Sequence, residues 1–206
     1  AWRSIIMTAI KICGLTTQQD ILSVNEALPD YIGFVFAPSK RQISLQKAVQ
    51  LKQMLSPSIK AVGVFVNETQ QNITSIVQKD IIDIVQLHGQ ETEQYIQTLK
   101  KSITVPIIKA ISVKTKQDIL QWQTTCADYL LLDNGIGGSG KTFDWSIIET
   151  IQIQKPYFIA GGLNIQNITT ALQKCPFALD VSSGVETNGQ KDKQKILEIT
   201  KCVKNF

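Results

Sequence analysis

YFIAGGLNIQNITTALQKCPFALDVSSGVE, residues 157–186, is the stretch that decides the fold. It holds two short apolar runs, 157–160 and 178–182, separated by a segment with helical character. Each run leads directly into small residues, Gly161-Gly162 after the first and Ser183-Gly184 after the second. A buried strand followed by a turn and a helix is the repeating unit of a parallel β/α protein.

The same alternation extends over the whole chain. A doubly wound open sheet usually has five or six strands and a glycine-rich turn after the first strand, where this chain has only Gly14. Eight near-equal units with late glycines therefore predict an α/β fold, a single (β/α)8 TIM barrel of the phosphate-binding type, over residues 7–206. The expected strands are 9–13, 31–36, 61–66, 82–87, 106–111, 129–133, 157–160 and 178–182. The expected helices are 17–27, 44–55, 68–78, 91–101, 113–124, 145–151, 164–174 and 192–203.

Composition narrows the function classes. The 206 residues are 43% hydrophobic and 18% charged, which is typical of a folded globular domain. The net charge is +4, but Lys and Arg are scattered, whereas nucleic-acid binding needs them concentrated on one face. No apolar run approaches the roughly 18 residues that a membrane span requires. We therefore expect a cytoplasmic protein with a small anionic substrate and no nucleic-acid or membrane partner.

The cysteines and the histidine limit the possible cofactors. The four cysteines are far apart and form no CxxC pair, so a disulfide framework is not expected. A single histidine nearly excludes a histidine-based metal site. We expect no metal ion. Residues 1–6 precede Met7, and we interpret them as a scar of cloning or the remnant of a linker.

The ends of the expected strands carry the candidate chemistry. In such barrels the active site lies at the carboxyl ends of the strands. Cys13 ends the first strand, and its thiolate can act as a base. Asp133 ends the sixth strand, where a carboxyl group can serve as general acid on the opposite side of a substrate. Substrate-binding candidates lie at three other strand ends: Arg41, His88 and Asp180.

Small residues in three late loops are candidates for phosphate binding. Glycine allows backbone N–H groups to approach a phosphate closely, and the loops after strands seven and eight commonly bind it. The loop after strand six resembles a lid or a second wall of such a pocket, although a surface loop has the same composition. The candidates are Gly138, Gly140, Gly161, Gly162, Ser183 and Gly184.

The segment GIGGSGKT at 135–142 has the spacing of a nucleotide-binding P-loop. That motif normally follows the first strand of an open sheet, whereas this segment follows the sixth strand. No nearby segment offers a convincing partner for Mg²⁺. Nucleotide binding stays an alternative that an ATP-binding test would settle.

Seven motifs, in order along residues 9–203, together carry a family resemblance. The chain resembles the N-(5′-phosphoribosyl)anthranilate isomerases of tryptophan biosynthesis. The resemblance implies an Amadori rearrangement of phosphoribosylanthranilate to carboxyphenylamino-deoxyribulose phosphate without a metal or organic cofactor. The motifs are KICG at 11–14, GFVFAPSKR at 33–41, VQLHG at 85–89, LLLD at 130–133, GGSGKTFDW at 137–145, IAGGLN at 159–164 and DVSSGVE at 180–186.

The resemblance also implies a role for several residues. Asp133 would protonate the furanose ring oxygen, and Cys13 would take the proton from C2′ of the sugar. Arg41 would lie near the anthranilate carboxylate, while the GGSG, AGG and SSG segments would surround the phosphate. We hypothesise that Arg41 and the loop N–H groups favour the thiolate of Cys13.

Three other readings remain open. An aminoaldose isomerase of histidine biosynthesis uses two aspartates, whereas Cys13 stands at the first position here. A sugar-phosphate epimerase would need histidines for its metal. A binding module without catalysis would not need both Cys13 and Asp133. We expect a monomer, with a dimer or a fusion to a neighbouring pathway enzyme as alternatives.

Overall fold

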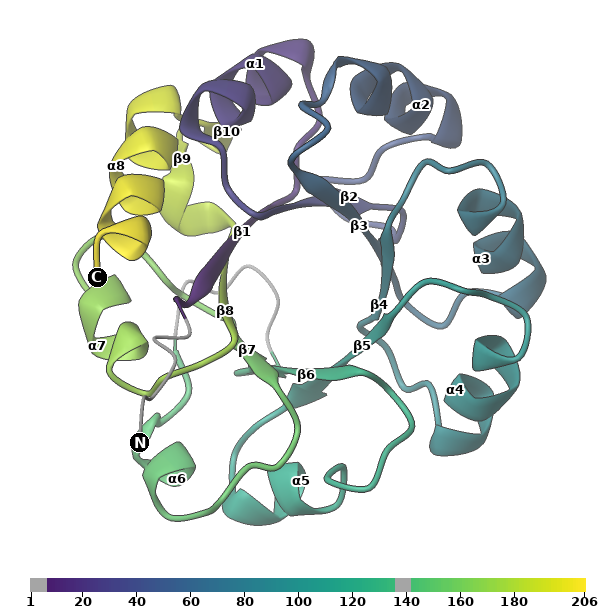
Figure 1. The fold of residues 1–206 in the computed structure, drawn as a ribbon, viewed down its shortest axis with the longest axis vertical. Coiled ribbons are helices and arrows are strands. Elements are labelled where there is room, and N and C mark those ends of the chain that lie inside the picture. Colours follow the sequence, from purple (N-terminus) through teal and green to yellow (C-terminus); the bar gives the residue numbers. More distant parts are fainter. Residues whose placement is uncertain (1–6, 136–141) are drawn as a thin grey trace.

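The computed structural model describes residues 7–135 and 142–206 and forms a closed barrel. Eight parallel strands pair in chain order, and β8 pairs with β1 to close the ring. Figure 1 looks down this ring, with the helices around it. The predicted (β/α)8 fold is confirmed. The strands are β1 (Ala9–Cys13), β2 (Tyr31–Val35), β3 (Lys60–Phe65), β4 (Ile84–Leu87), β5 (Ile107–Ser112), β6 (Tyr129–Asp133), β7 (Tyr157–Ile159) and β8 (Ala178–Val181).

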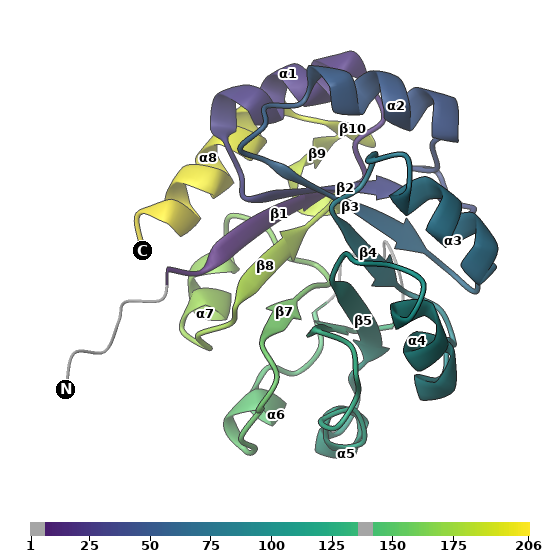
Figure 2. The same ribbon diagram turned by 45° about the vertical axis from the view of Figure 1, so that its right-hand side comes forward.

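Eight helices in the described ranges lie outside the strands (Figure 2). Most begin at a polar residue whose side chain accepts a backbone N–H of the first turn, as Thr17 does for α1 and Ser44 for α2. Apolar faces of these helices pack on the outer face of the barrel. The helices are α1 (Gln18–Ala27), α2 (Leu45–Met54), α3 (Gln70–Val77), α4 (Glu93–Lys100), α5 (Lys116–Leu120), α6 (Ser146–Glu149), α7 (Ile168–Leu172) and α8 (Lys193–Lys204).

Three helices are much shorter than predicted, namely α5, α6 and α7. After α5 the chain continues as single turns in which N–H groups bond three residues back, as from Gln123 to Leu120. Asn164 starts a similar turn before α7, and its carbonyl oxygen accepts the N–H groups of Asn167 and Ile168. The spacing of the apolar residues therefore correctly indicated which side of each segment is buried, but part of each segment forms turns instead of helix.

The barrel interior divides into an apolar half and a polar half. Side chains alternate along a strand, so every second residue points inward. Toward the amino ends of the strands the interior holds four aromatic rings, from Tyr31, Tyr129, Phe158 and Phe177, with centroids 4.9–5.9 Å apart. Toward the carboxyl ends several inward positions are polar or charged, among them Gln86, Asp133 and Asp180. This distribution confines any chemistry to the carboxyl end of the barrel.

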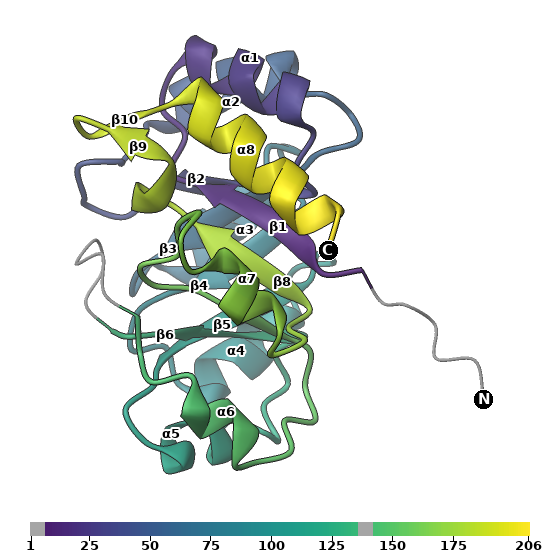
Figure 3. The ribbon, with the colours of Figure 1, turned by 90° about the vertical axis from the view of Figure 1, so that its left-hand side faces the viewer.

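A small hairpin follows β8 and was not predicted. A 3₁₀ turn (Ser183–Val185) leads into β9 (Glu186–Thr187), which pairs with β10 (Gln190–Lys191). Asn188 and Gly189 between them have φ values of 53° and 77°. An Asn-Gly pair is a strong hairpin signal, and the sequence contained it. Figure 3 shows the hairpin on the side of the barrel away from the C-terminus.

Two sequence expectations lie partly outside what the structure covers. Residues 1–6, interpreted as a scar or linker remnant, are not among the described residues, so the domain boundary at residue 7 stays a prediction. In the described ranges, no helix combines the length and the apolar character that crossing a bilayer requires.

Phe158 fills the centre of the barrel interior, fully buried and against three other rings. Replacing it with Ala should lower the free energy of unfolding by about 3–5 kcal/mol, because a cavity forms where its ring was. Urea denaturation measures this. The same truncation at Leu22, 53% exposed on α1, should cost about 0.5 kcal/mol or less. Equal losses at both sites would contradict the packing described.

Candidate active site

A cavity of about 520 Å³ opens at the carboxyl ends of the strands. Its lining comes from most of the strands and from the loops after β2, β7 and β8. Eight of the predicted site residues line it: Cys13, Arg41, His88, Asp133, Gly161, Gly162, Asp180 and Ser183. Gly184 lies behind this lining, and Gly138 and Gly140 fall outside the described residues. The strand-end argument therefore located the cavity correctly.

Strand alternation brings Cys13 and Asp133 into this cavity. Ala9 and Leu131 pack inside the barrel, and each catalytic candidate lies an even number of residues further along the same strand. Both are nearly buried, with 8% and 6% of their surface exposed. Because β1 and β6 are not neighbours, the two side chains approach the cavity from different sides.

Lys11 is the charged group most closely associated with Cys13. It lies two residues earlier on the same inner face, is fully buried, and its Nζ is 2.9 Å from Oδ1 of Asp180. Gly33 on β2 leaves room for the thiol, because a Cβ there would lie 2.5 Å from Sγ of Cys13. A thiol, an ammonium and a carboxylate thus share one wall of the cavity.

Burial raises the pKa of the Cys13 thiol, and the negative charge of Asp180 raises it further. Lys11 and Lys191 lower that pKa without overcoming the effect of burial. The ligand-free site therefore favours the protonated thiol. That Arg41 and the loop N–H groups favour the thiolate stays a prediction; the charges of Arg41 and Cys13 do interact.

Arg41 is held by a carboxylate of this chain. Its Nε and Nη2 donate to Glu186 at 2.7 and 2.9 Å, and Lys191 binds the same carboxylate at 2.8 Å. Gly14 makes space for the arginine, since a Cβ there would lie 2.4 Å from Cδ of Arg41. Burial alone would raise the pKa of Glu186, but the hydrogen bonds from Arg41 and Lys191 outweigh it and lower this pKa to about 2.

A second polar group surrounds Asp133. Its Oδ1 accepts the backbone N–H of Asn134 at 2.7 Å, and its Oδ2 lies 3.3 Å from Nε2 of His88. The other ring nitrogen of His88 is 3.0 Å from Nε2 of Gln86. His88, predicted as a substrate-binding residue, is therefore also a direct partner of the candidate acid.

The loops after β7 and β8 pack tightly against each other. Gly161 and Gly162 have φ values of 82° and 65°, which side chains rarely allow. A Cβ on Gly184 would lie 1.9 Å from the carbonyl oxygen of Leu163. Only small residues permit this arrangement, which brings two backbone turns to the same edge of the cavity.

The sequence analysis missed several residues of this site. Lys11, Gln86, Glu186 and Lys191 make the contacts described above, yet none was singled out. Lys11 did carry a signal, because a lysine flanked by isoleucines in a strand must be paired when buried. Lys191 and Glu186 had no such signal.

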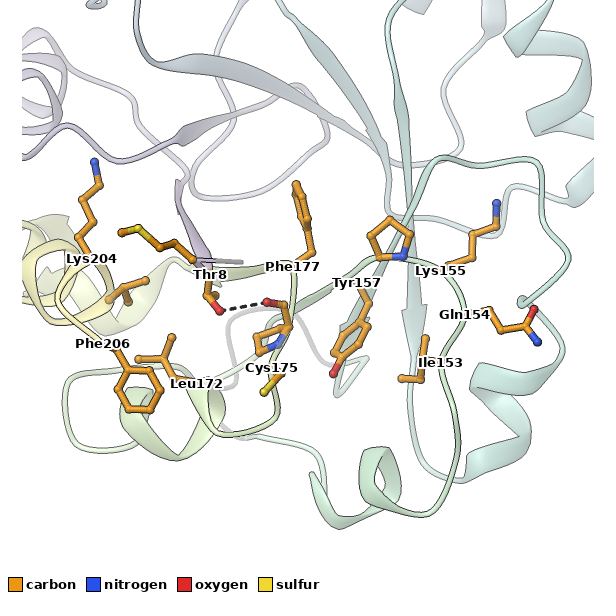
Figure 4. Close-up of a pocket in the computed structure, with 14 residues that line it drawn as sticks. Thr8, Ile153, Gln154, Lys155, Tyr157, Leu172, Cys175, Phe177, Lys204 and Phe206 are labelled. Atoms are coloured by element: carbon orange, nitrogen blue, oxygen red, sulfur yellow. Dashed lines mark hydrogen bonds between the residues drawn. The ribbon is translucent and has the colours of Figure 1, made fainter. Parts of the chain in front are cut away.

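A second cavity, of about 590 Å³, lies at the opposite end of the barrel (Figure 4). Its walls come from the residues before β1, β7 and β8 and from the end of α8. The side chains there are mainly apolar, and none is a carboxylate. In the described ranges, no group of three or more His, Cys, Asp or Glu side chains is placed to hold a metal ion.

Comparison with known proteins identifies one family. Residues 10–202 match the family model for "N-(5'phosphoribosyl)anthranilate (PRA) isomerase". A Streptococcus mutans protein named N-(5'-phosphoribosyl)anthranilate isomerase is 46% identical over 96% of this chain and 100% of its own.

Two solved structures are similar over 97% of this chain and 100% of theirs, each with a TM-score of 0.86 and 36% identity. One is a phosphoribosyl anthranilate isomerase in complex with reduced 1-(o-carboxyphenylamino)-1-deoxyribulose 5-phosphate. The other is described as mutually generated monomers of a dimeric isomerase from Thermotoga maritima.

The pKa of Glu186, about 2 in place of 4.5, predicts how acid affects stability. A lowered carboxyl pKa stabilises the fold fully above pH 4.5, and this contribution disappears as the pH falls toward 2. A Glu186→Gln variant should therefore be less stable than the parent at pH 7. The difference should shrink as the pH falls below 4.5, as urea denaturation at several pH values would show.

The exposed Glu198 on α8 provides the control for this experiment. Its replacement by Gln should change stability little at pH 7, because exposed charges contribute little. A difference for Glu186→Gln that stays constant between pH 7 and pH 2.5 would contradict the ion-pair account.

Proposed function

The chain belongs to the N-(5′-phosphoribosyl)anthranilate isomerase family, and we propose that Cys13 and Asp133 are its general base and general acid. The reaction is the Amadori rearrangement of N-(5-phosphoribosyl)anthranilate to 1-(2-carboxyphenylamino)-1-deoxyribulose 5-phosphate, an aldose-to-ketose isomerisation in tryptophan biosynthesis. Such a shift needs one acid and one base on opposite sides of the sugar. The single observation that carries the proposal is that both side chains enter one cavity from non-adjacent strands.

The steps follow from this placement. Asp133 gives a proton to the furanose ring oxygen, and the ring opens to a Schiff base. Cys13 then removes the proton from C2′, and the resulting enolamine rearranges to the ketone. In this proposal the chain's own acid and base supply all the catalysis.

The charges around Cys13 support its role as a base. Within residues 7–135 and 142–206, Lys11, Arg41 and Lys191 form ion pairs with two carboxylates, those of Asp180 and Glu186, which leaves an excess of one positive charge. A thiolate at Cys13 would neutralise that excess. We therefore attribute the stabilisation of the thiolate to the two lysines, and not mainly to Arg41.

The substrate would span the cavity from its phosphate to its anthranilate ring. Gly161, Gly162, Ser183 and Gly184 are the proposed phosphate-binding residues, supported by the positive φ values of Gly161 and Gly162 and by the close packing of Gly184 against Leu163. Gly138 and Gly140 remain candidates outside the described residues. Arg41 would bind the anthranilate carboxylate, and to do so it would share its guanidinium with Glu186.

The remaining proposals concern two site residues and the surroundings of the enzyme. Asp180, a substrate-binding candidate, is paired with the buried Lys11, and we propose that it positions this lysine beneath Cys13. His88 would lie beside the reacting sugar. We propose that the chain acts as a monomer in the cytoplasm, with neither nucleic-acid nor membrane partners.

Replacing either catalytic residue should abolish most of the activity. Cys13→Ala and Asp133→Asn should each reduce kcat by roughly 10²–10⁴-fold, the usual contribution of a positioned acid or base. Turnover of N-(5′-phosphoribosyl)anthranilate, followed in a fluorescence assay, measures this. Full turnover by either variant, with its fold intact, would remove that residue from the mechanism.

Two matched substitutions control for the chemical change itself. Cys202→Ala on α8 and Asp80→Asn in the loop before β4 lie away from the cavity, and both should keep the parental kcat.

A negative charge in the phosphate loop should weaken substrate binding. At about 4 Å a carboxylate and a phosphate repel each other by about 4 kcal/mol at an effective dielectric constant near 20. Ser183→Asp should therefore raise KM by at least about tenfold, which corresponds to about 1.4 kcal/mol, with a smaller effect on kcat. Steady-state kinetics measures both constants.

Thr104→Asp, in the exposed loop before β5, is the control for this change and should leave KM unchanged. An unchanged KM in Ser183→Asp would mean that the phosphate binds elsewhere in the cavity.

A further inference from the structure

Gln86, His88 and Asp133 form a row in which Gln86 and His88 are hydrogen-bonded and His88 contacts Asp133, and the acid–base scheme uses only Asp133. Gln86 and His88 lie two residues apart on and just beyond β4, and both face the cavity. Nε2 of Gln86 is 3.0 Å from Nδ1 of His88, and Nε2 of His88 is 3.3 Å from Oδ2 of Asp133. His88 is also the single histidine of the chain.

The chemistry of the amide gives this row a direction. An amide nitrogen only donates, so Nδ1 of His88 must accept and the ring proton must be on Nε2. Nε2 is the ring nitrogen that lies 3.3 Å from Oδ2 of Asp133. An Nε2–H group beside a carboxylate suits the state in which Asp133 has given its proton to a substrate.

Gln86 also carries an unused acceptor. Its side chain is 1% exposed, and its Oε1 has no hydrogen-bond partner among the described residues. A buried acceptor without a partner is costly. Rotating the amide by half a turn would bring Oε1 to Nδ1 of His88, where it could accept a ring proton. The amide thus has two orientations, and each one selects a different tautomer of the ring.

The proton balance of the reaction requires a group that returns a proton to Asp133 after each turnover. Substrate and product are isomers, yet one turnover leaves Asp133 without its proton and Cys13 with an extra one. The thiol must lose a proton and the carboxylate must regain one before the next cycle. Their strands are not adjacent, and 32% of the His88 side chain is exposed to solvent. Imidazole is the side chain that takes up and releases protons near neutral pH.

We propose that His88 returns the proton to Asp133 and that Gln86 is a positioning residue that sets the tautomer of the His88 ring. The proposal rests on the acid role of Asp133 proposed above.

In the resetting step, Nδ1 takes a proton from solvent as the amide rotates, and the Nε2–H bond breaks as an O–H bond forms on Oδ2 of Asp133. The ring is then neutral with its proton on Nδ1, donated to Oε1 of Gln86. Cys13 releases its extra proton to solvent. This step accompanies the binding of the next substrate. After Asp133 has protonated that substrate, exchange with solvent restores the Nε2–H form, which the ligand-free enzyme keeps.

Because the chain has one histidine, nitrogen NMR reads this ring without assignment. The untagged protein, labelled with ¹⁵N-histidine, should show the Nε2–H tautomer when the ring is neutral. Gln86→Leu, which removes the amide at similar volume, should shift the spectrum toward a mixture of tautomers. A parent spectrum of the Nδ1–H form, or a spectrum that Gln86→Leu leaves unchanged, would overturn the positioning role.

Kinetics test the proton return itself. His88→Gln should lower kcat by roughly tenfold or more, within the range of proton-transfer contributions, while KM changes by less than about threefold. Added imidazole should restore part of kcat in proportion to its concentration, an effect that a purely structural role would not produce. Parental kcat in His88→Gln, or a loss that imidazole does not restore, would overturn the relay.

The Asp133→Asn variant distinguishes a failure of the proton relay from a failure of the acid role of Asp133, on which the relay rests. An active Asp133→Asn variant would remove the acid role and the relay together. An inactive Asp133→Asn beside a fully active His88→Gln would remove only the relay. Thermal unfolding checks that each variant folds. If His88→Gln does not fold, the NMR experiment on Gln86→Leu tests the proposal instead.

Discussion

An ammonium group buried inside a barrel must be neutralised, and the pairing of Lys11 with Asp180 is the interaction on which the site depends. These residues face each other across the β1–β8 pair, the seam that closes the ring. A buried charge left alone costs several kcal/mol, so this register is strongly favoured over its alternatives. The pair also forms the boundary between the aromatic interior and the polar cavity. It thereby places a cation directly below Cys13.

The hairpin after β8 extends this charge arrangement from outside the barrel. Its turn at Asn188-Gly189 reverses the chain, so that Lys191 returns to Glu186 and to the carbonyl oxygen of Ser182. Glu186 in turn holds Arg41, which comes from the loop after β2. A short element with two residues in each strand thus connects the loops after β2 and β8. The hairpin contributes to the site through these contacts more than through its own stability.

The sequence was sufficient to predict the barrel and the position of the cavity, but not the ion pairs between the side chains of the site. Buried parallel strands are continuous apolar runs, and strand ends of one barrel converge, so Cys13 and Asp133 could be placed without coordinates. The ion pair of Arg41 with Glu186 joins residues 145 positions apart, and nothing local indicates it. Helix lengths were overestimated at α5 and α7, where amphipathic spacing continues into turns.

Cys13 and Asp133 have surroundings of different kinds, and this difference fits their division of labour. The thiol lies among lysines and an arginine whose charges exceed those of their partner carboxylates in the described part of the chain, which favours a base whose reactive form is an anion. Among the described residues, Asp133 contacts a backbone N–H and the imidazole of His88, and neither a lysine nor an arginine. A carboxyl group held by cations would stay ionised and could not act as an acid. In the part of the chain that the structure describes, the lysines and the arginine of the site thus lie with Cys13 and not with Asp133, as the proposed division of labour requires.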